Sequence, residues 1–480
     1  MKTGYVMGID NGTQSTKVVL FDMQGNEVAT GSCKLQETVA PKEGYVLHPG
    51  EDLWNSVLVG IERCLQDFNG DRREIQAIGL CTIRSCRVLM KEDMSLAYPV
   101  MNWMDIRLAK PHEYVNDDVS FVTSTSGYLG NRLTGERKDT AGNYEFNWPL
   151  DFNTWDWSTD DKVLAASGVT REMLFDLVLP GEKIGLLKRN LSERFELSEN
   201  IPVVATSNDK AVEVLGSGVF EDNTIVISLG TYISALLSKH KHFENAVNFF
   251  PTLAAIPYKY VYESQGIRRG MWTISWLKEV LGDRAVKEIE KIEDSSISVE
   301  DVLNMRAEEI KPGSEGLITI LDWLSTPDKP YRKGMMIGFD NRHTKYHMYR
   351  SILEAIAYNI KNNIDDMLNE TGDKIDRIVA IGGGSNSDVL MQIIADLFGL
   401  ETHRRRTSSG AALGAAISAY KYLGIYDSFE EAAKKTVKTE RVFSPDKENH
   451  KFYTEVNEKI IKSTRNFTDP LLQKMHELYK

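Results

Sequence analysis

One layout occurs twice in this chain and constrains its fold more than any other feature. Residues 8–22 (GIDNGTQSTKVVLFD) read as an apolar strand, a turn with glycine and threonine, and a second apolar strand. Residues 225–237 (IVISLGTYISALL) repeat that layout, with Gly230 and Thr231 at the turn. Hairpins placed roughly 220 residues apart predict two related domains, each of which opens with its own hairpin.

The rest of the chain indicates an α/β protein. Short β-branched runs alternate with amphipathic stretches, and a length of 480 residues allows about two to four domains. A polar break at residues 221–223 separates the two halves. We therefore expect an N-terminal domain over 1–221, a C-terminal domain over 222–443 and a helical tail over 444–480.

The composition limits the classes of partner that the protein can bind. The formal net charge is -12, which argues against broad electrostatic binding to nucleic acid or to an anionic membrane surface. The four cysteines show no CxxC spacing, and no apolar run reaches about 18 residues. These features predict a cytoplasmic protein without nucleic-acid or membrane partners. A compact anionic ligand would need a local cation or a backbone cradle.

The first hairpin carries such a cradle. A tight glycine turn exposes backbone N–H groups, hydroxyls add donors, a lysine adds charge, and an aspartate could hold hydrated Mg²⁺. These residues are Asp10, Gly12, Thr13, Gln14, Ser15 and Lys17. They suit a triphosphate tail, although a polar hairpin with an Asx turn would also fit. A P-loop is excluded because its lysine spacing is absent and a strand follows the turn.

A glycine run marks a second site. Residues 377–399 (RIVAIGGGSNSDVLMQIIADLFG) read as a buried strand, three glycines, and a helix that residues 385–387 can cap. Three glycines would let the backbone approach a flat ligand closely. The run also resembles a dinucleotide-binding fingerprint, with Glu401 downstream, which leaves an NAD-dependent oxidoreductase as an alternative. Ser387 replaces the third glycine of that fingerprint, and the alternative explains neither hairpin.

Asp209 lies where catalytic groups of α/β proteins gather. In residues 203–218 (VVATSNDKAVEVLGSG) a strand ends at Thr206, Ser207 can cap the next helix, and Asp209 follows at the sheet's carboxyl edge. Asp209 could accept a hydroxyl proton, or it could simply stabilise the start of the helix. Further candidates for a polyhydroxyl pocket are Arg84, Trp103, Asp105 and Arg107.

Taken in order along nearly the whole chain, these segments resemble the FGGY carbohydrate kinase family of the actin-like ATPase superfamily. The further matching motifs are WMDIR (103–107), NRLTGE (131–136), GMMIGFDNRHTKYHMYRSILEAIAY (334–358) and GAALGAAISAY (410–420). The resemblance implies two actin-like, ribonuclease H-like domains with a nucleotide cleft between them. It also implies closure of a hinge around ATP.

The resemblance assigns a role to each candidate. Asp209 is the expected catalytic base toward the sugar hydroxyl that attacks MgATP, and Asp10 is expected to hold Mg²⁺ through water. The Gly12–Thr13 and Gly230–Thr231 turns are expected to hold phosphates. The adenosine motif is matched by Gly383, Gly384 and Asn386, and the sugar motif by Trp103, Asp105 and Arg107.

The chain departs from the family pattern near the sugar. Asp209 stands between Asn208 and Lys210, and Lys210 could lower the pKa of the base or point to solvent. Only 24 residues separate Arg107 from Arg132, so an insertion usual in the family is missing. A ketose such as xylulose or another ketopentose is the expected substrate, with a glycerol-type polyol as the alternative. A non-catalytic actin-like ATPase is a more distant functional alternative. A homodimer is an assembly that the sequence allows.

Overall fold

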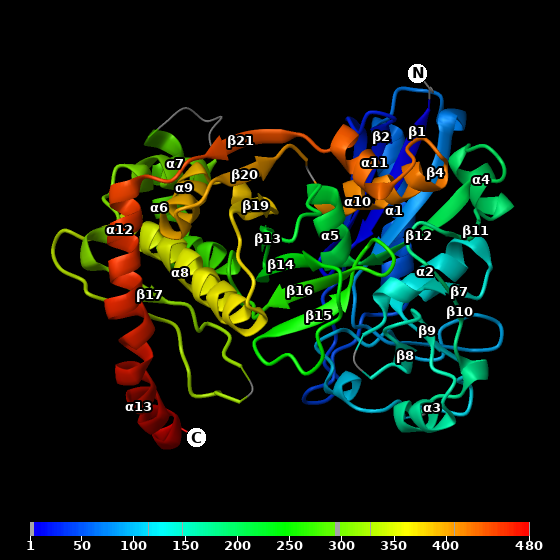
Figure 1. The fold of residues 1–480 in the computed structure, drawn as a ribbon, viewed down its shortest axis with the longest axis horizontal. Coiled ribbons are helices and arrows are strands. Elements are labelled where there is room, and N and C mark those ends of the chain that lie inside the picture. The colour runs from blue at the N-terminus through cyan, green and yellow to red at the C-terminus, as the bar shows by residue number, and fades with distance from the viewer. Residues whose placement is uncertain are drawn as a thin grey trace.

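The computed structural model describes residues 4–113, 115–145, 147–292, 298–326, 328–407 and 409–479, and it contains two large mixed sheets (Figure 1). The first has the strand order β11-β12-β4-β1-β2-β3. Its strands are β1 (Tyr5–Asn11), β2 (Ser15–Asp22), β3 (Glu27–Lys34), β4 (Ile75–Thr82), β11 (Lys183–Leu186) and β12 (Pro202–Asn208).

The second sheet repeats the central arrangement of the first. Its order is β15-β16-β14-β13-β19-β20-β21. Its strands are β13 (Thr224–Leu229), β14 (Ile233–Lys239), β15 (Phe249–Leu253), β16 (Tyr260–Ser264), β19 (Arg377–Ile381), β20 (Thr402–Arg405) and β21 (Thr439–Phe443). β1 pairs antiparallel with β2 and parallel with β4, and β13 pairs in the same way with β14 and β19. Both predicted hairpins form, and each lies inside its sheet with a neighbouring strand on either side.

Helices and small two-stranded sheets surround this frame. The helices are α1 (Asp52–Asp67), α2 (Thr125–Thr134), α3 (Asp161–Ser167), α4 (Arg189–Phe195), α5 (Asp209–Ser217), α6 (Trp272–Ile292), α7 (Val299–Glu308), α8 (Lys345–Thr371), α9 (Asp388–Phe398), α10 (Gly410–Tyr422), α11 (Phe429–Thr436), α12 (Lys447–Val456) and α13 (Lys462–Leu478). The small sheets pair β5 (Val88–Met90) with β6 (Phe121–Thr123), β7 (Lys138–Thr140) with β10 (Asp176–Val178), β8 (Leu150–Asp151) with β9 (Asp156–Trp157), and β17 (Ile318–Ile320) with β18 (Met335–Ile337).

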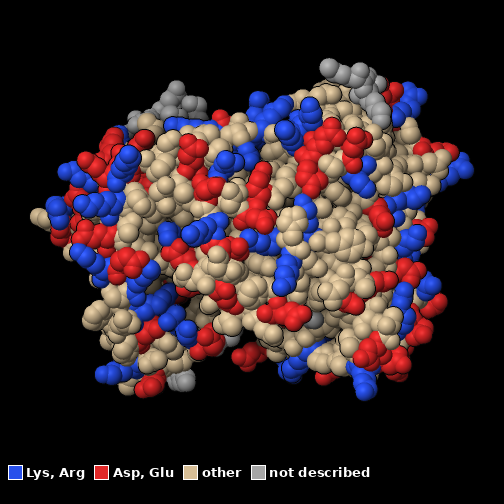
Figure 2. All heavy atoms as spheres, in the orientation of Figure 1, with Lys and Arg blue, Asp and Glu red and all other residues tan. Residues whose placement is uncertain are grey.

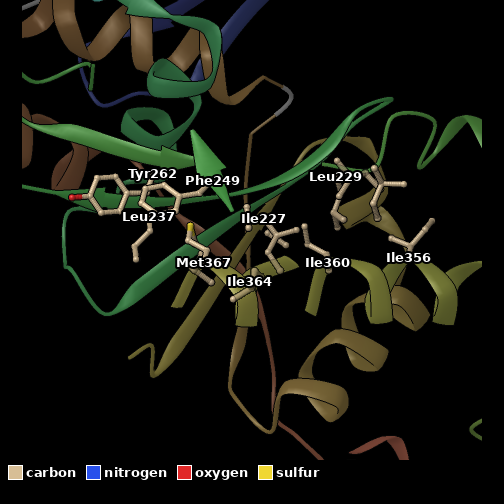
Figure 3. Close-up of a cluster of buried hydrophobic side chains, with 14 of the residues drawn as sticks. Ile227, Leu229, Leu237, Phe249, Tyr262, Ile356, Ile360, Ile364 and Met367 are labelled. Carbon is tan, nitrogen blue, oxygen red and sulfur yellow. The ribbon is translucent and has the colours of Figure 1, made fainter. Parts of the chain in front are cut away.

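Helix α8 covers one face of the second sheet. Its residues Ile356, Ile360, Ile364 and Met367 recur at helical spacing and belong to one buried cluster with Ile227, Leu229, Leu237, Phe249 and Tyr262 of the strands (Figure 3). This apolar layer fixes the position of β13, and therefore of the turn that follows it.

Helices α5 and α10 pack against each other between the two sheets (Figure 1). Close approach there depends on glycine, because a β-carbon on Gly8 of β1 would collide with the carbonyl oxygen of Ala412, and one on Gly216 with that of Gly410. Helix α10 thus lies in the predicted C-terminal domain but packs on the first sheet. The predicted break at 221–223 falls between the two sheets, and the full domain limits stay a prediction.

The exterior agrees with the composition. Acidic and basic side chains are interspersed over the face shown in Figure 2. The four cysteines carry free thiols, three of them buried. Across the described parts of the chain, every helix is too short or too polar to cross a lipid bilayer.

Candidate active site

Asp209 is the first residue of α5. The strand β12 continues to Asn208, whose side chain accepts a 3.0 Å hydrogen bond from the backbone N–H of Ala211. The expected cap, Ser207, instead donates from its hydroxyl to the carbonyl oxygen of Gly142. The cap therefore lies one residue later than the sequence predicts, because β12 extends to Asn208, which pairs with Thr82 of β4 after a break in register beyond Ala205.

Asp209 combines partial burial with strong nearby charges. Its side chain is 23% exposed, and its Oδ1 lies 3.6 Å from Nε of Arg84. Burial is the main effect on the pKa of Asp209 and raises it; Arg84 and Lys210 oppose that rise, and Glu213 and Glu263 add to it. A carboxylate in this setting can accept a proton at a higher pH than an exposed aspartate can.

Arg84 connects the two halves of the molecule. Its Nη2 lies 2.5 Å from Oε2 of Glu263 on β16, and its Nη1 lies 3.6 Å from Oε1 of Glu145. Glu263 is only 1% exposed and also accepts a hydrogen bond from Ser234. The guanidinium therefore holds two buried glutamates and the candidate base in one network.

Lys210 points inward rather than to solvent. Its ammonium donates to Glu213, one turn along α5, and to the hydroxyl of Ser228 on β13. It lowers the pKa of Asp209, which is one of the two alternatives that the sequence left open. Lys210 thus connects the start of α5 to β13, the strand that precedes the turn at residues 230–231.

Asp10 lies at the end of β1, opposite Lys17 of β2, and its Oδ2 accepts a 3.2 Å hydrogen bond from Ser409. Burial, reinforced by Glu213 and Asp209, raises the pKa of Asp10 to about 7, against the opposing effects of Ser409 and Lys17. Three carboxylates therefore repel one another at this point.

This repulsion suits a divalent cation. Within the parts of the chain that the structure describes, no three His, Cys, Asp or Glu residues are placed to enclose a metal ion. Mg²⁺ usually keeps several waters and takes one or two carboxylates together with phosphate oxygens, so Asp10 with water fits it. A bound cation would relieve the repulsion among Asp10, Asp209 and Glu213.

Asp10 makes the stability of the ligand-free protein depend on pH. Its carboxyl keeps its proton more readily in the folded state than in the unfolded state. The free energy of unfolding therefore falls as pH rises from about 3.8, and it stops falling above about pH 7. We expect Asp10→Asn to stabilise the protein by about 2–4 kcal/mol at pH 8 and by less at pH 5. Melting temperatures at both pH values measure this. Asp161→Asn at the exposed start of α3 is the control, and an equal gain at both pH values would contradict the expectation.

The two turns that are predicted to hold phosphates occupy equivalent places after β1 and β13. Thr13, Gln14 and Ser15 are exposed, as is Thr231. The Gly12 N–H is not open, however, because it donates to the carbonyl oxygen of Ser15 and closes the turn. In the first turn, residues 13–15 are therefore accessible to a ligand, whereas the N–H of Gly12 is used in a hydrogen bond within the turn.

The glycine run divides into structural and open positions. Gly382 has a φ of +84°, which favours glycine, and a β-carbon on Gly384 would lie 2.8 Å from Sδ of Met271. A β-carbon on Gly383 would meet nothing within 4 Å, and Asn386 is exposed. Gly382 and Gly384 are therefore required by the backbone conformation and by the packing. Gly383 and Asn386 are the accessible residues of the predicted adenosine motif.

The WMDIR segment forms a loop with one exposed aromatic face. Trp103 is 42% exposed, whereas Asp105 is buried and accepts hydrogen bonds from the backbone N–H groups of Val46 and Arg107. Asp105 also forms a two-pronged ion pair with the guanidinium of Arg107. Its carboxylate is thus used to hold the loop, and direct sugar contacts by Asp105 and Arg107 stay a prediction.

Three acidic residues of the site escaped the sequence analysis: Glu145, Glu213 and Glu263. Glu213 follows Asp209 by four residues and so lies on the same side of α5. Glu263 is the one charged residue of the buried strand β16, YVYES. The spacing of Glu213 and the charge of Glu263 within a strand are signals that point to these two residues. The sequence around Glu145 contains no comparable signal.

Comparison with known proteins identifies the family. Two models, the N-terminal and C-terminal domains of the FGGY family of carbohydrate kinases, match residues 5–120 and 225–421. The chain is 41% identical over 478 residues to the uncharacterized sugar kinase YgcE of Escherichia coli (strain K12), covering 100% of this chain and 96% of that protein. It is 26% identical to a xylulose kinase of Lactococcus lactis subsp. lactis (strain IL1403), covering 98% and 99%.

A solved structure agrees with the architecture. Gluconate kinase from Lactobacillus acidophilus superposes with a TM-score of 0.82 at 19% sequence identity, covering 99% of this chain and all of that one. The likeness confirms the two-domain, actin-like α/β fold. With both family models matched in order and a sugar kinase as a close relative, this chain belongs to the FGGY family of carbohydrate kinases and is an ATP-dependent sugar kinase.

Proposed function

We propose that this kinase transfers the γ-phosphoryl group of MgATP to a hydroxyl of a ketose, most simply a ketopentose such as xylulose. The observation that carries the proposal is the position of Asp209, at the start of α5, partly exposed and 3.6 Å from Arg84. A base in this setting can take the proton of an attacking hydroxyl. Membership in a kinase family displaces the oxidoreductase and the non-catalytic ATPase that the sequence left open.

In this mechanism the chain chiefly positions groups and balances charge, as phosphoryl transfer requires. Asp209 accepts the hydroxyl proton, and Arg84 and Lys210 keep it ionised. Asp10 would hold Mg²⁺ through water, and the cation would neutralise charge on the phosphates. The turns at residues 12–15 and 230–231 hold the phosphates, Gly383, Gly384 and Asn386 receive the adenosine, and Trp103 offers an aromatic face to the sugar.

The parts of the chain divide this work. Residues 1–221 supply the base, the sugar face and the first phosphate turn, residues 222–443 supply the second turn and the adenosine motif, and 444–480 form the tail. The catalytic network nevertheless crosses this division, because Arg84 contacts Glu263 and Lys210 contacts Ser228. A cytoplasmic location accords with the four free thiols.

A glycerol-type polyol is the second candidate, because curated relatives of similar identity include glycerol kinases. A coupled ADP-release assay with xylulose, ribulose, fructose, gluconate and glycerol separates the candidates. We expect saturable turnover with a ketopentose at the highest kcat/KM, and a phosphorylated product detectable by phosphorus NMR. A higher kcat/KM for glycerol would favour the polyol, and a higher value for gluconate would contradict both.

A further inference from the structure

A cavity of about 320 Å³ adjoins the loop that carries residues 103–107. This volume falls in the range of small-ligand pockets. Six of its lining residues are charged or aromatic: Tyr45, Arg87, Tyr98, Arg107, Lys110 and Glu113. None of them contacts Asp209 in the network described above.

Arg87 is the unusual residue of this cavity, because it is buried without a counter-ion. It is 5% exposed, and in the described parts of the chain no carboxylate lies within ion-pair distance of it. Its Nε has no hydrogen-bond partner there, its Nη2 makes one long bond of 3.4 Å to the carbonyl oxygen of Lys110, and its guanidinium lies over the ring of Trp148. A buried, unpaired charge costs free energy, so a native chain that retains one calls for a reason.

The neighbouring charges make the cavity a site for an anion. Burial and the repulsion of Arg107 lower the pKa of Arg87 to about 10, which leaves it charged at neutral pH. Arg107 is stacked on Tyr45, with its guanidinium carbon 4.0 Å from the ring centroid, and is neutralised by Asp105. Lys110 adds a cation, and Glu113 is the one acid among the lining residues.

Arg84 and Arg87 are close in sequence, but their side chains contact different groups. Ser85 has a φ of +53°, a left-handed conformation that bends the chain between Arg84 and Arg87. Arg84 reaches Glu145, Asp209 and Glu263, whereas Arg87 reaches Lys110 and Trp148. The charges of Arg107 and Asp105 act on the pKa of Arg87, and Arg87 in turn lowers the pKa of His112. None of Arg107, Asp105 and His112 belongs to the Asp209 network described above.

We propose that this cavity is a second binding site, separate from the phosphoryl-transfer site, for a small organic anion whose carboxylate or phosphate monoester pairs with the guanidinium of Arg87. A guanidinium can present two parallel N–H groups to either anion, and Tyr45 and Tyr98 give the rest of a small ligand an aromatic wall. The proposal goes beyond the kinase activity and holds whichever sugar that activity uses.

Isothermal titration at constant ionic strength tests it, with 3-phosphoglycerate and inorganic phosphate as probes and glycerol as the uncharged control. We expect saturable binding of 3-phosphoglycerate at one site, weakened roughly ten- to a hundredfold in Arg87→Met. Arg189→Met is the matched control, because Arg189 is an exposed arginine of α4 paired with Glu193. Its affinity for the probe should equal that of the wild type.

A second readout separates ligand binding from a structural role. Arg87→Met removes an unpaired buried charge, so its melting temperature without probe should equal or exceed that of the wild type. A marked fall in melting temperature would make Arg87 a structural residue and overturn the proposal. Arg87→Lys keeps the charge but loses the paired N–H groups, so we expect it to weaken probe binding about tenfold.

Three further results would overturn the proposal. One is the absence of saturable probe binding down to millimolar affinity. Another is an affinity that Arg87→Met and Arg87→Lys leave unchanged. The third is competition between 3-phosphoglycerate and the sugar substrate, which would place the cavity within the sugar site rather than apart from it.

Discussion

Replacing Asp209 by asparagine is expected to lower kcat by about 10²- to 10⁴-fold while ATP binding is retained. The substitution keeps the shape of the side chain and its place at the start of α5 but removes the carboxylate that we propose as the proton acceptor. The coupled ADP-release assay measures kcat, and titration with ATP measures nucleotide binding. The effect should be selective because the turns and the glycine run that are predicted to bind ATP lie on other segments.

Asp161 provides a control for the structural explanation. It is the first residue of α3 and is exposed, so it occupies the same helical position as Asp209 without the charged surroundings. If Asp209 only stabilised the start of its helix, Asp209→Asn and Asp161→Asn would each cost a few tenths to about 1 kcal/mol of stability and leave kcat alone. A retained kcat in Asp209→Asn would therefore refute the role of base.

The pH profile of the wild type supplies a second check. Because the pKa of Asp209 is raised, kcat/KM should fall on acidification at a higher pH than the ordinary titration of an aspartate would give. Arg84 and Lys210 limit that rise. Removal of Arg84 should therefore move the acidic limb of the profile to still higher pH.

Much of the fold could be predicted because it follows from local patterns. The hairpins at 8–22 and 225–237 each combine two apolar strands with a polar turn, and strands, helices and turns of this kind are encoded by nearby residues. Asp209 could be found for the same reason, since it follows a buried strand and opens a helix. The resemblance to a known family then placed the separate motifs in one molecule.

The remaining features depend on contacts that sequence spacing does not reveal. Glu263 and Arg84 are 179 positions apart and meet only when the two sheets come together. Gly384 is required by the side chain of Met271, which lies on a different segment. Asp105 matches a sugar motif in sequence, yet its hydrogen bonds to Val46 and Arg107 fix a loop. Such roles are decided by tertiary packing.

The ion pair between Arg84 and Glu263 should contribute strongly to stability. Arg84→Met leaves Glu263 and Glu145 buried without their shared cation, and we expect it to lower the free energy of unfolding by about 3–5 kcal/mol. Glu263→Gln should also destabilise, because Arg84 then loses its shortest contact. Thermal and urea denaturation measure both effects.

A double-mutant cycle isolates the pair from the rest of the network. In Arg84→Met with Glu263→Gln, the loss should be smaller than the sum of the single losses by about 0.5–3 kcal/mol, because the buried carboxylate of Glu263 is no longer left without its cation. The matched pair is Arg189 and Glu193, exposed on α4, for which the coupling should be about 0.3–0.5 kcal/mol. Equal coupling in the two cycles would show that the buried pair contributes no more than a surface pair.

The location of this pair makes a further consequence testable. Arg84 follows β4 of the first sheet and Glu263 belongs to β16 of the second, so the contact fastens the two halves together. Its loss should make the segments between the sheets more accessible to limited proteolysis before global unfolding. If Arg84→Met lowered the melting temperature without faster cleavage, the pair would stabilise the fold as a whole and not specifically the contact between the two halves. If MgATP suppressed faster cleavage of Arg84→Met, ligand binding would be shown to hold the two halves together in place of the Arg84–Glu263 ion pair.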